Sequence, residues 1–260
     1  MPLRIAVITT SPGQGSTTYA TGLAWSAAAD RSVRLIDADP AVGTIRTLLD
    51  LDGRASIENV LGSAAVQAAA LEAQSIRIEK RPQLSVVPGF RRWEFRHGQV
   101  ISRLAPALSQ LPDDVVIVDL GCPFDPPEGG AQPATAMLGA HFDAVLVVLR
   151  AQADLLERAI RLLDGAPLSR ARLVVCRPPQ RREMDRTLAL LREHLPAFPD
   201  PLEWDWDHSR VLKHDVRGEP VHSAGMLEET GLLGAGQPVP TVTGGRGRGR
   251  FRFSSRRSEP

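Results

Sequence analysis

The chain has 260 residues, of which 43% are apolar, and a formal net charge of +1. An apolar fraction of this size predicts a globular protein with a sizeable core. Its two cysteines, Cys122 and Cys176, lack a CxxC spacing, which argues against a disulfide framework or a zinc site. No apolar run approaches the roughly 18 residues of a membrane-spanning helix, and the N-terminus reads as a strand rather than a signal peptide. We therefore expect a cytoplasmic protein.

The charge is unevenly distributed along the sequence. Residues 241–260 contain six Arg and one Glu, which is about +5, so the other 240 residues carry about −4. The glycine-rich and arginine-rich stretch from residue 235 onward cannot build a core. We predict one folded domain over 1–234 and a disordered basic tail over 235–260.

Strand-length apolar runs alternate with segments of helical period. Taken in chain order, the predicted strands cover 5–8, 33–36, 84–87, 115–118, 144–149 and 172–176, with a weaker one at 202–206. Predicted helices cover 17–29, 100–111, about 154–163, and 184–195, where Met184, Leu188, Leu191 and Leu195 share one helical face. The six histidines are scattered without the spacing of metal ligands, and each is interpreted as a surface residue.

Continuous apolar strands that alternate with helices predict an α/β fold. Such strands are buried on both faces, so the sheet is mostly parallel, doubly wound and covered by helices on both sides. Ligands of these sheets bind at the carboxyl ends of the strands. Thr10, Asp37 and Asp119 come at or just after the ends of three predicted strands. The sequence therefore predicts one site at this edge.

Residues 11–18, Ser-Pro-Gly-Gln-Gly-Ser-Thr-Thr, connect the first strand to the first helix. A glycine-rich loop at a helix N-terminus can direct several backbone N–H groups toward one anion. Gly13 and Gly15 permit the backbone angles that such a loop needs, and the Thr17 hydroxyl is a candidate ligand of Mg²⁺. The alternative interpretation is a plain strand–helix connection capped by threonine.

This loop resembles that of the ParA/MinD family of P-loop ATPases, whose deviant Walker A motif reads roughly KGGxGKTT. The resemblance implies a P-loop NTPase fold in which the nucleotide phosphates bind residues Gly13, Gln14, Gly15, Ser16, Thr17 and Thr18. Both family lysines are missing here. The phosphate-binding lysine falls on Ser16, and the signature lysine, which reaches the nucleotide of a dimer partner, falls on Ser11. Pro12 also removes one backbone donor.

Two further motifs support the resemblance, which extends over about residues 3–222. The segment Leu35-Ile-Asp-Ala-Asp-Pro40 is similar to the family's DxDP motif, which implies roles in water activation and metal positioning for Asp37 and Asp39. We expect these two catalytic positions to be inherited but inactive in this chain. Asp119, at the end of a β-branched run, is similar to the Walker B aspartate, which with Thr17 would hold Mg²⁺. Residues 218–221, Gly-Glu-Pro-Val, resemble a closing element of the family. In place of the asparagine that often recognises adenine, this chain has Cys176 or Arg177.

The missing lysines decide the expected function. Each charge-assisted hydrogen bond to a phosphate is worth about 1.5–3 kcal/mol, and cationic groups supply much of the rate of phosphoryl transfer. We expect a ParA/MinD-like positioning or regulatory protein that binds ATP or ADP with Mg²⁺ weakly or not at all, without efficient hydrolysis. It would act through protein partners, and any dimer would form without nucleotide.

Two alternatives remain open from the sequence. The first is a slow ATPase in which the lysine is replaced from a second subunit or by an arginine such as Arg177. The second is a nucleic-acid-binding module in which the basic tail binds phosphates by counterion release. Such a tail could also bind an anionic membrane surface. Either kind of binding would place the protein at the periphery of the membrane or at the nucleoid.

Overall fold

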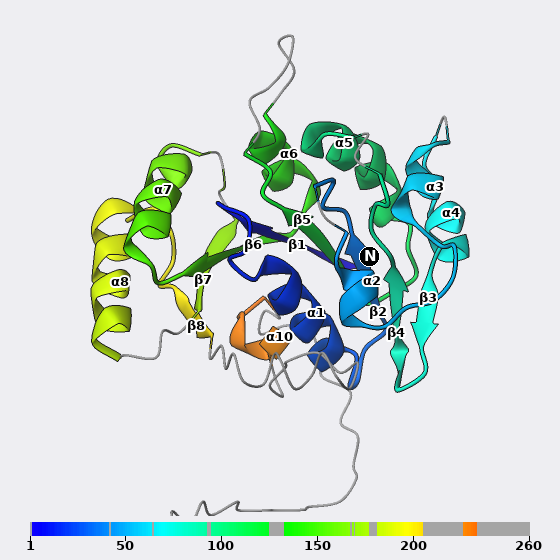
Figure 1. Ribbon diagram of the computed structural model, residues 1–260, viewed down its shortest axis with the longest axis horizontal. Coiled ribbons are helices and arrows are strands. Elements are labelled where there is room, and N and C mark those ends of the chain that lie inside the picture. Colours follow the sequence, from blue (N-terminus) through cyan, green and yellow to red (C-terminus); the bar gives the residue numbers. More distant parts are fainter. Residues whose placement is uncertain are drawn as a thin grey trace, which may run out of the picture.

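A computed structural model describes residues 2–41, 43–63, 65–92, 95–124, 133–166, 168, 170–176, 181–204 and 226–232. Its centre is an eight-stranded sheet with the order β3-β4-β2-β5-β1-β6-β7-β8 (Figure 1). All neighbouring strands pair in parallel except β3, which is antiparallel to β4. The strands are β1 (Leu3–Thr9), β2 (Val33–Asp37), β3 (Ile76–Ile78), β4 (Arg81–Val87), β5 (Val115–Gly121), β6 (Ala144–Arg150), β7 (Ala171–Cys176) and β8 (Leu202–Trp204).

Helices cover both faces of this sheet (Figure 1). One face packs against α1 (Ser16–Ala27), α2 (Ile45–Leu48) and α10 (Met226–Glu229), with Leu23, Ile45 and Leu227 fully buried in that layer. The opposite face packs against α3 (Ile57–Leu61), α4 (Ala68–Ala73), α5 (His97–Leu108), α6 (Ala134–His141), α7 (Ala153–Leu163) and α8 (Arg181–His194). The central strands β2 and β5 are buried along their whole length, as expected for continuous apolar strands between two helical layers.

The predicted fold class is confirmed: the sheet is mostly parallel and lies between two helical layers. The seven predicted strands and four predicted helices all correspond to observed elements. The eight-residue helix α6 and the shorter elements β3, α2, α3, α4 and α10 were not predicted. None of the helices in the described ranges has the length and apolar character that crossing a bilayer requires. The tail over 235–260, Arg177 and residues 218–221 lie outside the described residues.

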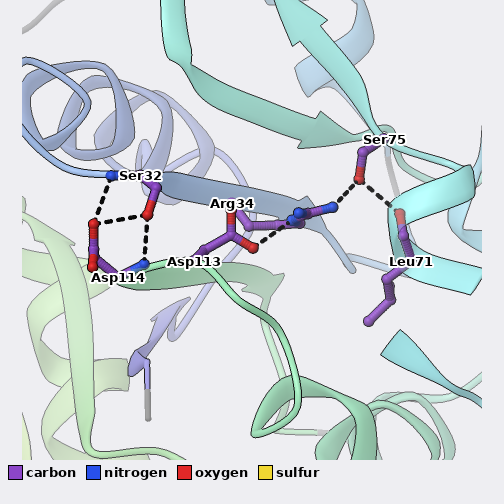
Figure 2. Close-up of polar contacts among 6 residues, drawn as sticks. All are labelled: Ser32, Arg34, Leu71, Ser75, Asp113 and Asp114. Carbon is purple, nitrogen blue, oxygen red and sulfur yellow. Dashed lines mark hydrogen bonds and ion pairs between the residues drawn. The ribbon is translucent and has the colours of Figure 1, made fainter. Parts of the chain in front are cut away.

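A polar cluster holds the amino ends of the central strands (Figure 2). Arg34 of β2 is buried and donates from Nε to Asp113 Oδ2 at 2.9 Å and from Nη1 to Ser75 Oγ at 2.6 Å. Beside it, Asp114 accepts from both the backbone N–H and the hydroxyl of Ser32. These hydrogen bonds lower the pKa of the Asp114 carboxyl. The cluster lies at the end of the sheet opposite the carboxyl ends of the strands, so it stabilises the fold away from the candidate ligand site.

Candidate functional site

The sheet register brings the predicted site residues together. Asp37 and Asp119 are direct neighbours on the paired strands β2 and β5, and Asp119 also pairs with Val7 of β1. The β1–β5 register shifts just beyond this point, where Ile8 pairs with Gly121. Thr10 follows β1 directly and is fully buried. The loop over residues 11–18 and the carboxylates of the neighbouring strands β2 and β5 therefore lie at the same edge of the sheet, as the sequence predicts.

The loop over residues 11–18 has the backbone shape that an anion site needs. Gly13 and Gly15 have φ angles of +78° and +93°, which residues with a Cβ rarely adopt. Gly15 is the N-cap of α1, and no side chain caps this helix. Its first-turn N–H groups and the positive end of a 12-residue helix are therefore directed at the loop. The two serines of the loop, Ser11 and Ser16, are both buried, with 5% and 6% of their surface exposed.

Gln14 fastens the loop to the sheet through its side chain. It is fully buried, donates from Nε2 to Thr10 Oγ1 at 3.1 Å, and accepts at Oε1 from the backbone N–H of Arg150 at 3.1 Å. The Cys176 thiol lies 3.6 Å from the Gln14 carbonyl oxygen, to which it donates. Both polar atoms of the Gln14 side chain are engaged in these hydrogen bonds. Any contribution of Gln14 to ligand binding would therefore come from its main chain. Cys176 likewise packs behind the loop.

Two of the three predicted carboxylates are completely buried. Burial raises the pKa of Asp119 to about 7, against a smaller opposing effect of a hydrogen bond from the Thr17 side chain. Burial also raises the pKa of Asp37 well above its usual range, and the nearby charge of Asp119 adds to this. One oxygen of each is engaged, since Ile45 N donates to Asp37 Oδ2 at 3.0 Å and Gly121 N to Asp119 Oδ1 at 3.3 Å. Two adjacent carboxylates in a dry environment favour a cation or a proton.

The remaining oxygens of this pair suit a divalent cation. Across the described residues, neither Asp37 Oδ1 nor Asp119 Oδ2 has a hydrogen-bond partner, which is costly for buried polar atoms. The same part of the chain contains no cluster of three His, Cys, Asp or Glu side chains placed to hold a metal. Mg²⁺ commonly uses one or two carboxylates and completes its shell with water and phosphate oxygens. Thr17 and Asp119 fit that kind of site, with Asp37 adjacent.

Asp39, the third predicted carboxylate, is partly exposed, whereas Asp37 and Asp119 are completely buried. Its Oδ1 accepts from Ala41 N at 2.9 Å and lies 3.9 Å from His97 Nε2. Gly121 has a φ of +60°, and a Cβ at this position would come within 2.2 Å of Asp39 Oδ2. Glycine at the last position of β5 is thus required by the close approach of Asp39. His97 is 4% exposed, so its interpretation as a surface residue is wrong.

A cavity of about 580 Å³ lies over these groups. Gly13, Gly15, Ser16, Thr17 and Thr18 of the loop line it, together with Asp39 on the carboxylate side. Among the lining residues that the sequence did not indicate are His97, Cys122, Arg150 and Arg158. Arg150 ends β6, so the rule that ligands bind at carboxyl ends of strands could have indicated it. Arg158 is one of several arginines on α7, and no sequence signal distinguishes it.

Comparison with known proteins gives a clear result only at the level of structure. No protein-family model matches the sequence, and no curated protein matches it. A ParA family ATPase from Chlorobium tepidum TLS aligns with a TM-score of 0.66 at 18% identity, over 85% of this chain and 91% of that one. MinD in a MinC:MinD cell division complex from Aquifex aeolicus gives 0.62 at 18%, over 84% and 87%.

A third solved structure carries a nucleotide. The septum site-determining protein MinD from Pyrococcus horikoshii OT3, complexed with Mg-ADP, aligns with a TM-score of 0.56 at 18% identity, over 89% of this chain and 94% of that one. All three relatives are matched over most of their length, which leaves little room for a different architecture in either chain. The chain has the fold of the ParA/MinD P-loop ATPases.

Proposed function

We propose that this chain is a positioning or regulatory protein of the ParA/MinD type that binds a nucleotide weakly, does not hydrolyse it efficiently, and acts through protein partners. The observation that carries the proposal is the loop over residues 11–18. It keeps the backbone shape of a phosphate site, but the lysine positions hold Ser11 and Ser16, both buried and uncharged. Backbone N–H groups alone support phosphate binding, whereas cationic groups are a main source of rate in phosphoryl transfer.

A bound Mg²⁺ would neutralise phosphate charge and orient the phosphate oxygens. The Thr17 hydroxyl and the Asp119 carboxylate are the groups that would hold it, because Thr17 lines the cavity and its side chain is hydrogen-bonded to Asp119, which is buried behind it. Asp39 lines the same cavity and Asp37 lies behind it. Thr17 and Asp119 would thus position a cation, and Asp39 would orient water near the phosphates.

The fold also suits a protein that works through complexes. One of the solved relatives is MinD bound to the protein MinC, so this architecture can present a surface to a protein partner. In the ParA/MinD family the signature lysine allows two nucleotides to face each other across a dimer. With Ser11 in its place, those charges would be uncompensated in a dry interface, which is costly. We therefore propose that any dimer forms independently of ATP.

ATP turnover by purified protein tests the catalytic part of the proposal. We expect hydrolysis at the background rate, and a Ser16→Lys variant should gain nucleotide affinity because it places a cation beside the loop. The matched control is Ser109→Lys, which adds the same charge at the C-cap of α5, outside the residues that line the cavity. Turnover in wild-type protein comparable to that of a partition ATPase, and lost in Asp119→Ala, would contradict the proposal and favour the slow-ATPase alternative.

Sedimentation velocity with and without ATP and Mg²⁺ tests the oligomerisation part. We expect the same mass in both conditions. A shift from monomer to dimer on addition of ATP would mean that other residues have replaced the signature lysine, and the inference from Ser11 would have to be abandoned.

A further inference from the structure

Residues of opposite charge lie on opposite sides of the loop along the carboxyl edge of the sheet. The sheet order β2-β5-β1-β6 places Asp37 and Asp119 on one side of the loop that follows β1, and Arg150, at the end of β6, on the other. Helix α7, which follows β6, adds Arg158 to the same side. The loop itself has no charged residue between positions 10 and 18. An anion in the loop would therefore have carboxylates on one flank and two guanidinium groups on the other.

Arg158 is directed at the loop rather than at its own helix. Its Nε donates to the Thr10 carbonyl oxygen at 3.2 Å, although the two residues are 148 positions apart in the sequence. Within the described part of the chain, this is the hydrogen bond that the Arg158 side chain makes, and no ion pair engages its terminal nitrogens. The contact fixes the Arg158 guanidinium at the cavity wall and leaves its terminal N–H groups available as donors.

Arg150 flanks the loop from the neighbouring strand. Its backbone N–H donates to Gln14 Oε1, so the residue is fixed relative to the loop, and it lines the cavity. Its charge opposes the effect of burial on the nearby Cys176 thiol, whose pKa is raised to about 12. The pairing of Arg150 with Cys176 across β6 and β7 puts both residues behind the loop. A guanidinium recognises phosphate oxygens through paired N–H donors, so it is a natural substitute for a lysine at such a position.

We propose that Arg150 and Arg158 replace the missing loop lysines within the same chain, and that they bind the phosphate groups of a nucleoside di- or triphosphate in this cavity. The inference deepens the proposed function and rests on it, because it assigns the residues that provide the weak nucleotide affinity. The phosphate charge would be neutralised from β6 and α7 instead of from the loop and a second subunit. Binding would consequently need no dimer.

The test is isothermal titration calorimetry with MgATP and, separately, with inorganic tripolyphosphate. Arg158→Gln and Arg150→Gln remove the charge while keeping a side-chain amide, and the Arg150 backbone contact with Gln14 is unaffected by its side chain. We expect each variant to weaken binding of both ligands by about tenfold or more, the usual effect of losing a charge-assisted hydrogen bond. The matched control is Arg161→Gln, since Arg161 lies on the same helix but is 68% exposed and paired with Glu157.

A triple variant separates charge from loop damage. Adding Ser16→Lys to Arg150→Gln/Arg158→Gln returns a cation to the cavity at the family position, and we expect affinity to recover. Affinity that stays low would mean that the glutamines had distorted the loop, which would overturn the inference. Unchanged affinity in the double variant would overturn the inference alone and leave the proposed function standing. Wild-type protein that binds neither MgATP nor tripolyphosphate would overturn both.

Discussion

Removing the charge of Asp119 should stabilise the protein when no divalent metal is present. This carboxylate is completely buried, and its pKa is raised to about 7, mainly by burial, whereas an unfolded aspartate has a pKa of about 3.9. Between these values the folded state holds a proton that the unfolded state releases. The stabilising contribution of that proton is complete below about pH 4 and is lost as the pH rises through about 7.

The magnitude follows from the size of the shift. A difference of about three pH units corresponds to at most about 4 kcal/mol, at about 1.4 kcal/mol per unit. Asp119→Asn removes the charge and keeps an oxygen that can accept from Gly121 N, as Oδ1 does at 3.3 Å. A buried amide still has a desolvation cost. We therefore expect the variant to be more stable than wild type by about 1–3 kcal/mol at pH 8, and by much less at pH 5.

Urea denaturation at pH 5 and pH 8, with a chelator present, measures this difference directly. An exposed carboxylate provides the control, because Asp200→Asn removes the charge of a side chain that is 80% exposed and should change stability by a similar small amount at both pH values. Adding Mg²⁺ should reverse the order at pH 8 by stabilising the wild type only. A variant less stable than wild type at pH 8 without metal, or a gain equal at both pH values, would refute the reasoning.

Two further predictions concern other parts of the chain. Asp113→Asn should cost about 3–5 kcal/mol in the free energy of unfolding, because it leaves Arg34 buried with an uncompensated charge; urea denaturation measures this cost, and a loss no larger than that of Asp200→Asn would contradict it. If the basic tail binds nucleic acid, deleting residues 241–260 should remove most duplex DNA binding and abolish a log–log salt slope of about −5, which about six phosphate contacts would give. Fluorescence anisotropy at several salt concentrations measures this slope, and binding that survives the deletion would place the site on the folded domain.

Much of the architecture was predictable because its signals are local. The run Val115–Val118 is β-branched and apolar throughout, which only a strand buried on both faces readily accommodates. The rule that ligands bind at the carboxyl ends of strands then places Thr10, Asp37 and Asp119 together, and the register of β2, β5 and β1 does so. The first helix was also predictable, from the glycine-rich loop that precedes it.

The rest of the site depends on tertiary contacts that leave no local pattern. Arg158 has the sequence context of an ordinary exposed helical arginine, and only its contact with Thr10 identifies it. His97 is buried because α5 begins against Asp39, which no spacing in the sequence indicates. Helices such as α2 and α3, with four and five residues, are too short to show a helical period. Their positions follow from packing against the sheet.

The inward-turned amide of Gln14 has an energetic consequence for whatever the loop receives. Its hydrogen bonds to Thr10 and Arg150 hold the loop in shape by contacts internal to the chain. A loop ordered in this way has already lost its conformational freedom during folding, so a ligand does not have to supply that entropy on arrival. Ordering a single residue costs about 1–2 kcal/mol. Over several loop residues, preorganisation can therefore contribute substantially to the affinity of a loop that contains no lysine.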